Sequence, residues 1–245
     1  MPPLLERLGV ELPVVQAGMG GGISRHELAA AVSEAGGLGT IAVNGAGAIR
    51  RELTAARALT GRPLAVNVLL PFARRDWFEA AGTADVVVTF WGVPKRRTGG
   101  VWLHQCGSVE EARRAQAVGA DGVIVQGVEA GGHVRGTTLA LQLLEEARRA
   151  LPPEYPVLLA GGIAEREDVQ AALTRALGQP SPERASSSPM RAAPTLYIRS
   201  ASWEPRRPSS PTSSAPPGPP PTASSPTPPP TTSSAGVRPY RGICP

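Results

Sequence analysis

Residues 1–179 alternate short apolar runs with amphipathic helical runs, and this alternation limits the folds open to the chain more than any other feature. Seven runs have the length and content of β-strands: 13–16, 38–43, 63–70, 85–90, 101–105, 121–126 and 156–160. Most are nearly continuously apolar, as is typical of parallel strands covered on both faces. Strands that alternate with helices predict a parallel α/β domain. Seven of them predict a (β/α)₈ TIM-barrel-like fold that lacks its eighth unit.

Two of the intervening helices carry the pattern of a capping box. Ser24 and Ser108 each stand at a predicted helix start, with Glu27 and Glu111 three residues further on. A serine hydroxyl in this position accepts a hydrogen bond from a free backbone N–H of the first turn. We therefore expect both serines to cap helices.

The connection between the fourth and fifth predicted strands is unusually short. Only residues 95–100 separate the segment "DVVVTFWGVP" from the segment "VWLHQC". A crossover between parallel strands needs about a dozen residues or more. Either a helix has been lost here, or one of the two strands lies outside the barrel.

Residues 180–245 have a different composition from the rest of the chain. They hold 18 of the 27 prolines, together with one Leu, one Val, two Ile and no Phe. Such a segment cannot bury a core, so we predict a disordered Pro/Ser/Thr-rich tail. It begins where an eighth strand is due, which favours out-of-frame translation of a GC-rich gene over a natural tail. Without that strand the barrel is expected to stay open at two edges.

The net charge of +5 arises entirely in this tail. Residues 1–179 carry 18 basic and 18 acidic side chains, whereas residues 180–245 carry 7 arginines and 2 glutamates. The neutral body has no basic stripe, so no nucleic-acid partner is expected. The two cysteines lack metal-ligand spacing, so no metal site is expected. No signal peptide or membrane-spanning run is recognisable, and a cytoplasmic protein is expected.

The loop after the strand at 121–126 reads "QGVEAGGHVRG". In a TIM barrel, the loops at the carboxyl ends of the strands carry the chemistry. Gly127, Gly131 and Gly132 would let the backbone approach a flat ligand closely, and His133 can exchange protons near neutral pH. A glycine-rich turn with an incidental surface histidine would have the same sequence. The spacing alone leaves both interpretations open.

Two other segments also allow two interpretations each. Gly161 and Gly162 lie between a strand end and a helix start, which is typical of a phosphate site but also of a tight turn. Asn67 lies within an apolar strand, where its amide needs either a polar ligand or an internal hydrogen-bond network. The segment "AGMGGGIS" is not a dinucleotide fingerprint, because Ile23 replaces its third glycine.

The chain has two further histidines. His26, in the first turn of a helix, is expected to be solvated. His104, inside a strand, is expected to pack in the core. Neither histidine is therefore assigned to the chemistry of the protein.

Four segments in order resemble the nitronate monooxygenase family, formerly called 2-nitropropane dioxygenases. They are "LPVVQAGMGGGISRHELAAAVSEAGGLGTIA", "VVVTFWGVP", "GADGVIVQGVEAGGHVRG" and "VLLAGGIAERED". The third is the most specific, and the second departs slightly from the family pattern S-F-x-F-G-x-P. The resemblance covers most of residues 8–178. It implies an FMN-dependent TIM-barrel enzyme that oxidises alkyl nitronates with O₂ to carbonyl compounds and nitrite.

The resemblance also implies site residues. His133 matches the family's catalytic histidine. The positions that match flavin contacts are Ala17, Gly18, Met19, Asn67, Gln126, Gly131, Gly161 and Gly162. The family's Gly-Thr phosphate turn after the eighth strand has no counterpart in residues 180–245. Weak FMN binding and little activity are therefore expected of this chain.

Two alternatives stay open. One is a flavin-dependent enoyl-acyl-carrier-protein reductase of the same superfamily, whose loop more often has Ser where this chain has Ala130. The other is a truncated product without function.

Overall fold

The computed structural model describes residues 3–95, 99–163, 167–169, 172 and 195–198. The chain divides into two units, Met1–Trp203 and Glu204–Pro245, and every described residue belongs to the first. The strands are β1 (Val14–Gln16), β2 (Gly39–Ile41), β3 (Leu64–Leu69), β4 (Val86–Phe90), β5 (Val101–Cys106), β6 (Gly122–Gln126), β7 (Val157–Ala160) and β8 (Thr195–Ile198). All seven strands expected from the apolar runs are confirmed.

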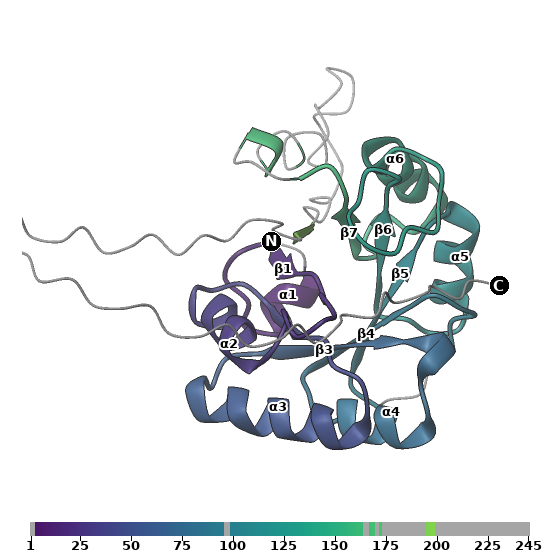
Figure 1. Ribbon diagram of the computed structural model, residues 1–245. Helices are drawn as coiled ribbons and strands as arrows, with labels where there is room; N and C mark the ends of the chain where they lie inside the picture. The colour runs from purple at the N-terminus through teal and green to yellow at the C-terminus, as the bar shows by residue number, and fades with distance from the viewer. Residues whose placement is uncertain (1–2, 96–98, 164–166, 170–171, 173–194, 199–245) are drawn as a thin grey trace, which may run out of the picture. The chain divides into compact units, whose positions relative to one another are not determined.

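All helices but the first lie on the outer side of the strands (Figure 1). The helices are α1 (Pro3–Arg7), α2 (His26–Glu34), α3 (Ala46–Leu59), α4 (Arg75–Ala81), α5 (Val109–Ala117) and α6 (Ala140–Ala150), with a 3₁₀ turn η1 (Leu70–Phe72). None of the helices in the described part of the chain has the length and hydropathy needed to cross a membrane.

The strands form one parallel sheet in the order β1-β8-β7-β6-β5-β4-β3-β2. Val15 also bridges Leu38, the residue directly before β2. There the N–H of Gln16 donates to the carbonyl of Leu38, and the N–H of Leu38 donates to the carbonyl of Val14, each at 3.0 Å. The two ends of the strand order therefore meet, which is the arrangement of a (β/α)₈ barrel.

The prediction that the barrel lacks its eighth unit is wrong for the strand. In β8, Leu196 lies level with Val14 of β1 and with Leu159 of β7. Residues 180–245 are poor in apolar residues as a whole, so their average composition does not predict a strand. They nevertheless contain one short run, "TLYI", of residue types that favour strands. The rest of the predicted disordered tail lies outside the described residues.

Both strands that flank the short crossover belong to the barrel. Val86 pairs with Val101, and Thr89 pairs with His104. The alternative in which one strand lies outside is therefore wrong. The described residues of the connection, 91–95 and 99–100, form no helix. The connection spans ten residues, 91–100, and a chain of ten residues can reach at most about 33 Å. That is enough to return along a five-residue strand of about 17 Å.

Side chains alternate between the barrel interior and the helix layer. Leu38, Leu103 and Ile124 share one buried cluster in the interior with residues of α1, so this short helix packs against the interior core. Trp102 and Val123 belong to a second cluster, with α5 and α6. A third cluster joins β3 and β4 to α3 and α4. The fold thus buries both faces of the sheet, as the apolar runs predict.

His104 packs in the core, as expected. By strand alternation it lies on the same outer face as Trp102. Its Nδ1 is 2.8 Å from Oγ1 of Thr89, which also accepts a hydrogen bond from Nε1 of Trp102 at 2.7 Å. Burial lowers the pKa of His104 to about 4, so the ring is neutral at pH 7.

One of the two predicted capping boxes is confirmed. The Ser108 hydroxyl accepts from the N–H of Glu111 at 3.2 Å, and the Glu111 carboxylate accepts from the N–H of Gly107 at 2.8 Å. The prediction for Ser24 is wrong. Arg25 is the N-cap of α2 and forms no side-chain cap bond. Ser24 is buried instead, because its hydroxyl satisfies backbone groups of the preceding loop.

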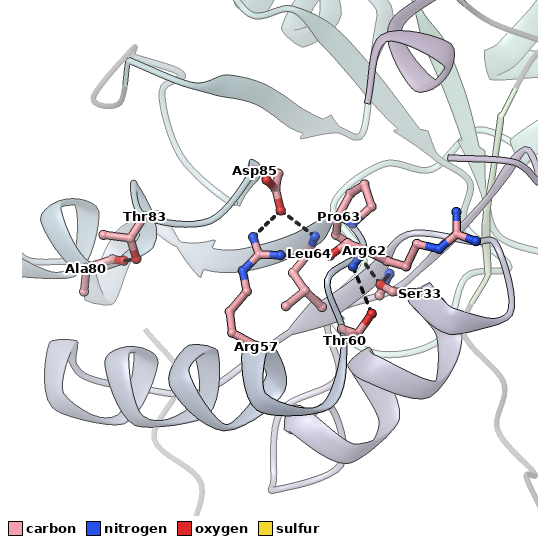
Figure 2. Close-up of polar contacts among 10 residues, drawn as sticks. Ser33, Arg57, Thr60, Arg62, Pro63, Leu64, Ala80, Thr83 and Asp85 are labelled. Atoms are coloured by element: carbon pink, nitrogen blue, oxygen red, sulfur yellow. Dashed lines mark hydrogen bonds and ion pairs between the residues drawn. The ribbon is translucent and has the colours of Figure 1, made fainter. Parts of the chain in front are cut away.

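The amino ends of β3 and β4 are joined by Asp85 (Figure 2). Its carboxylate accepts from the backbone N–H of Leu64 at 2.8 Å and pairs with Arg57 of α3. Nearby, the Ser33 hydroxyl of α2 donates to the carbonyl of Pro63 at 2.7 Å. These contacts connect two helices to the start of β3, at the end of the barrel opposite the loops that carry chemistry.

A proline in β8 tests the place of this strand in the sheet. Proline cannot donate to a strand ladder, so we expect Leu196→Pro to lower the free energy of unfolding by about 2–3 kcal/mol. Urea unfolding measures the change. The control is Ala223→Pro in the Pro-rich stretch "PPPTASSPTPPP", with an expected change within about 0.5 kcal/mol. Equal effects of the two substitutions would contradict the position of β8.

Candidate active site

Three side chains on β2, β3 and β6 each leave a buried polar atom without a hydrogen-bond partner in the described part of the chain. The atoms are Thr40 Oγ1, Asn67 Oδ1 and Gln126 Oε1. Strand alternation places all three inside the barrel, because Leu38, Ala65 and Ile124, two residues earlier in each strand, belong to the interior cluster. An unsatisfied buried polar group costs about 1–3 kcal/mol. A polar ligand in the barrel mouth would remove that cost.

The loop after β1 packs directly on Asn67. A Cβ atom at Gly18 would lie 2.5 Å from Cβ of Asn67, so no larger residue fits without movement. Ser24 holds this loop in place. Its Oγ accepts from the N–H of Met19 at 2.9 Å and donates to the carbonyl of Ala17 at 3.2 Å. The structure thus brings together four of the predicted site residues. Ser24, predicted to cap a helix, instead supports the loop after β1.

The loop after β6 is fixed at both ends. Nε2 of Gln126 donates to the backbone carbonyl of His133 at 2.9 Å. Both carboxylate oxygens of Glu129 lie 3.0 Å from the N–H of Ala140, the first residue of α6. A Cβ at Gly127 would collide with the Ala140 backbone, which explains the glycine that directly follows β6.

The two glycines after β7 lie against this same loop. Gly161 and Gly162 have φ angles of 109° and 67°, which residues other than glycine rarely adopt. A Cβ at Gly161 would lie 3.1 Å from the backbone nitrogen of Ala130, and one at Gly162 would lie 3.0 Å from Cγ of Glu129. The β6 and β7 loops, both predicted to contact one ligand, are therefore neighbours. Gly131 lies in the exposed part of the β6 loop.

The exposed side chain of His133 contacts Trp91, which directly follows β4. The ring centroids are 4.7 Å apart and the planes meet at 62°, an edge-on contact. Trp91 has a φ of 63°, the one positive value at a described non-glycine residue. Such a backbone conformation costs on the order of 1–3 kcal/mol and occurs mostly at functional sites. Trp91 is not predictable as a site residue, since nothing in "TFWGVP" indicates a positive φ before the glycine.

The sequence profile of the nitronate monooxygenase family matches residues 2–86 and 80–178, more than half of the chain. The chain belongs to the nitronate monooxygenase family. A nitronate monooxygenase of Pseudomonas aeruginosa is 34% identical over 227 residues, which cover 68% of this chain and 63% of that protein.

A second curated relative is a dehydrogenase. It is the (3aS,4S,5R,7aS)-5-hydroxy-7a-methyl-1-oxo-octahydro-1H-indene-4-carboxyl-CoA dehydrogenase of Mycobacterium tuberculosis, 33% identical over 189 residues, which cover 70% of this chain and 51% of that protein. The chain thus spans between about half and two thirds of the length of these two relatives.

Solved structures show the same barrel. FabK from Thermotoga maritima superposes with a TM-score of 0.68 at 28% identity, covering 81% of this chain and 61% of FabK. A nitroalkane oxidase from Streptomyces ansochromogenes superposes with a TM-score of 0.61 at 34% identity, covering 69% of this chain and 63% of that one. Both solved proteins share the fold of this chain.

A separate ionic cluster surrounds Glu52 of α3. Nδ1 of His26 lies 2.6 Å from Oε2 of Glu52, and the Arg25 guanidinium lies 2.9 Å from Oε1. Oε1 of Glu27 is 3.2 Å from Nε2 of His26. Burial acts to raise the pKa of Glu52, but the hydrogen bonds from His26 and Arg25 outweigh it and lower the pKa to about 2. The expectation that His26 is merely solvated is therefore wrong.

Unfolding at two pH values tests this cluster. The pKa of Glu52 is about 2 in the folded chain against 4.5 for the free group, so its stabilisation is complete above pH 4.5 and is lost as the pH falls toward 2. We expect Glu52→Gln to cost about 1.5–3 kcal/mol at pH 7 and much less near pH 2. The control is Glu79→Gln in an exposed pair with Arg75, with an effect within about 0.5 kcal/mol. An equal loss at both pH values would refute the pKa shift.

Two glycines of the β1 loop form a matched pair for mutation. Gly18→Ala places a methyl group against Asn67 and should lower the free energy of unfolding by about 1–3 kcal/mol. Gly20→Ala meets nothing within 4 Å and should be neutral or slightly stabilising. Thermal and urea unfolding measure both. A Gly18→Ala variant as stable as Gly20→Ala would show that Asn67 can move aside.

Proposed function

We propose that this chain binds FMN in the barrel mouth and oxidises alkyl nitronates with O₂ to carbonyl compounds and nitrite. The observation that carries the proposal is the set of unsatisfied buried atoms on Thr40, Asn67 and Gln126, which face the barrel interior. Gln126 also holds the backbone of the His133 loop. Family membership supports the reaction class. The eighth strand removes one of the two reasons for expecting the chain to be inactive.

The residues present suit a flavin. Its ring edge carries both donors and acceptors, and the side-chain oxygens of Asn67 and Gln126 are free to accept hydrogen bonds. Gly18 leaves the surface beside Asn67 without a side chain. The residues that would hold the cofactor are Ala17, Gly18, Met19, Asn67, Gln126 and Gly131 around the ring, with the backbone of Gly161 and Gly162 at the phosphate. When bound, FMN supplies the redox chemistry.

His133 is the residue that would meet the nitronate. Its imidazole can act as a general base or as a hydrogen-bond donor near neutral pH. The ring is exposed, and Gln126 fixes the backbone from which it projects. A nitronate is an anion, so a donor at this position would both bind it and orient it. Neighbouring apolar side chains, such as Phe90 and Trp91, would limit the access of water.

Enoyl-thioester reduction is the second candidate. It is favoured by the superposition on FabK, which covers 81% of this chain at 28% identity. Ala130, where such reductases more often have Ser, weakens it. Anaerobic mixing with NADH separates the two, because rapid bleaching of the flavin would favour the reductase. A colourless purified protein would instead favour a product without function.

A substitution at His133 tests the proposed reaction. We expect His133→Asn to retain FMN and to lose about 10²–10⁴-fold in turnover of alkyl nitronates, the usual contribution of one acid–base group. Nitrite release and the flavin absorbance measure the two quantities. The control is Thr137→Ala, an exposed residue further along the same loop, which should change neither. Loss of flavin with unchanged turnover in the remaining holoenzyme would make His133 structural.

A further inference from the structure

We propose that Trp91 is a positioning residue that sets the orientation of the His133 ring. This inference rests on the proposed function, in which His133 meets the substrate. Trp91 follows β4, whereas His133 lies in the loop after β6, so their edge-on contact joins two loops that are separated in the sheet by β5.

Within the described ranges, His133 has little else to orient it. Its neighbours Gly131 and Gly132 are exposed, and Gly132 has a φ of 85°. Gln126 holds the backbone carbonyl of His133 but not its ring. Among residues 3–95 and 99–163, no side chain forms a hydrogen bond to the ring nitrogens. Flexible glycines next to an unrestrained imidazole would allow many orientations, and an aromatic edge contact restricts them.

The contacts and the backbone conformation of Trp91 restrict the position of its own ring. Its ring stacks on Phe90 with centroids 5.8 Å apart. The following Gly92 has a φ of 143°, and a Cβ there would lie 3.1 Å from Cβ of Leu70, so the turn sits tightly against the end of β3. A bulky residue keeps a positive φ only where its surroundings impose it. This backbone conformation places the indole against the His133 ring.

The indole also borders a groove of about 240 Å³ on the β3 and β4 loops. The groove is lined by Leu70, Pro71, Ala73, Phe78, Trp91, Gly92 and Val93. Trp91 thus borders both this groove and the histidine, so loss of its ring would enlarge the space around His133. A positioning role affects how often the imidazole is aligned with a bound substrate. It predicts a change in kcat with little change in KM for a short alkyl nitronate.

Three substitutions distinguish the effect of the Trp91 ring from the effect of its positive φ angle. Trp91→Phe keeps an aromatic edge, Trp91→Leu removes it, and Trp91→Gly removes it while accepting the positive φ without strain. The chain has three histidines, so the ring protons of His133 can be identified in an NMR spectrum by their loss in His133→Asn. Unchanged signals of His26 and His104 report an intact fold.

We expect the His133 ring signals of Trp91→Leu and Trp91→Gly to move to the position of a freely rotating histidine, while Trp91→Phe keeps most of the ring-current displacement. With the FMN-loaded enzyme and propyl nitronate, we expect kcat to fall by about 2- to 10-fold in the first two and to be largely retained in Trp91→Phe.

Unmoved His133 signals in Trp91→Leu and Trp91→Gly would overturn the inference, as would an unchanged kcat in an active enzyme. An inactive parent whose His133 signals respond as expected would count against the proposed function alone, because the NMR measurement needs neither flavin nor turnover.

Discussion

Closure of the parallel sheet is the constraint on which the rest of this structure depends. β8 pairs with β1 and β7, and the bridge between Val15 and Leu38 joins β1 to β2. Because all strands run in the same direction, closure brings every carboxyl end to one mouth. Thr40, Asn67 and Gln126, which come from distant parts of the chain, thereby face the same interior. An open sheet would leave these side chains on an uncovered face, where water could satisfy their polar atoms.

The mouth is assembled through close backbone approaches that only glycine allows. Gly18 lies against Asn67, and Gly161 lies against the loop that carries His133. The first contact packs the loop after β1 on a strand of the barrel, and the second packs the loop after β7 on the loop after β6. Because these residues are glycines, no side chain fills the space between the loops. Ser24 and Glu129 then satisfy backbone groups that such tight loops would otherwise leave unpaired. The candidate site therefore owes its shape to the absence of side chains as much as to their presence.

The short connection after β4 has a local consequence. In a regular βα unit a helix would follow this strand, but the described residues here form only a turn that contains Trp91 in a strained conformation. The contact of Trp91 with His133 links this turn to the most specific segment of the family pattern. Trp91 thus belongs both to the short connection that replaces a regular helix and to the candidate site, through its contact with His133.

The sequence by itself determined the parallel α/β class, seven strands and the cap at Ser108, because apolar periodicity and local motifs depend only on neighbouring residues. That Gly18, Asn67, Gln126 and His133 form one site is implied by the family resemblance and stays a prediction. The tertiary structure alone decided where β8 comes from, since four strand-forming residues do not stand out within a proline-rich segment until their two neighbours are in place. It also decided that Ser24 supports a loop rather than a helix, that His26 pairs with Glu52, and that Trp91 meets His133. Each of these contacts joins groups that are distant in the sequence. The groups come within reach of one another only when the barrel closes.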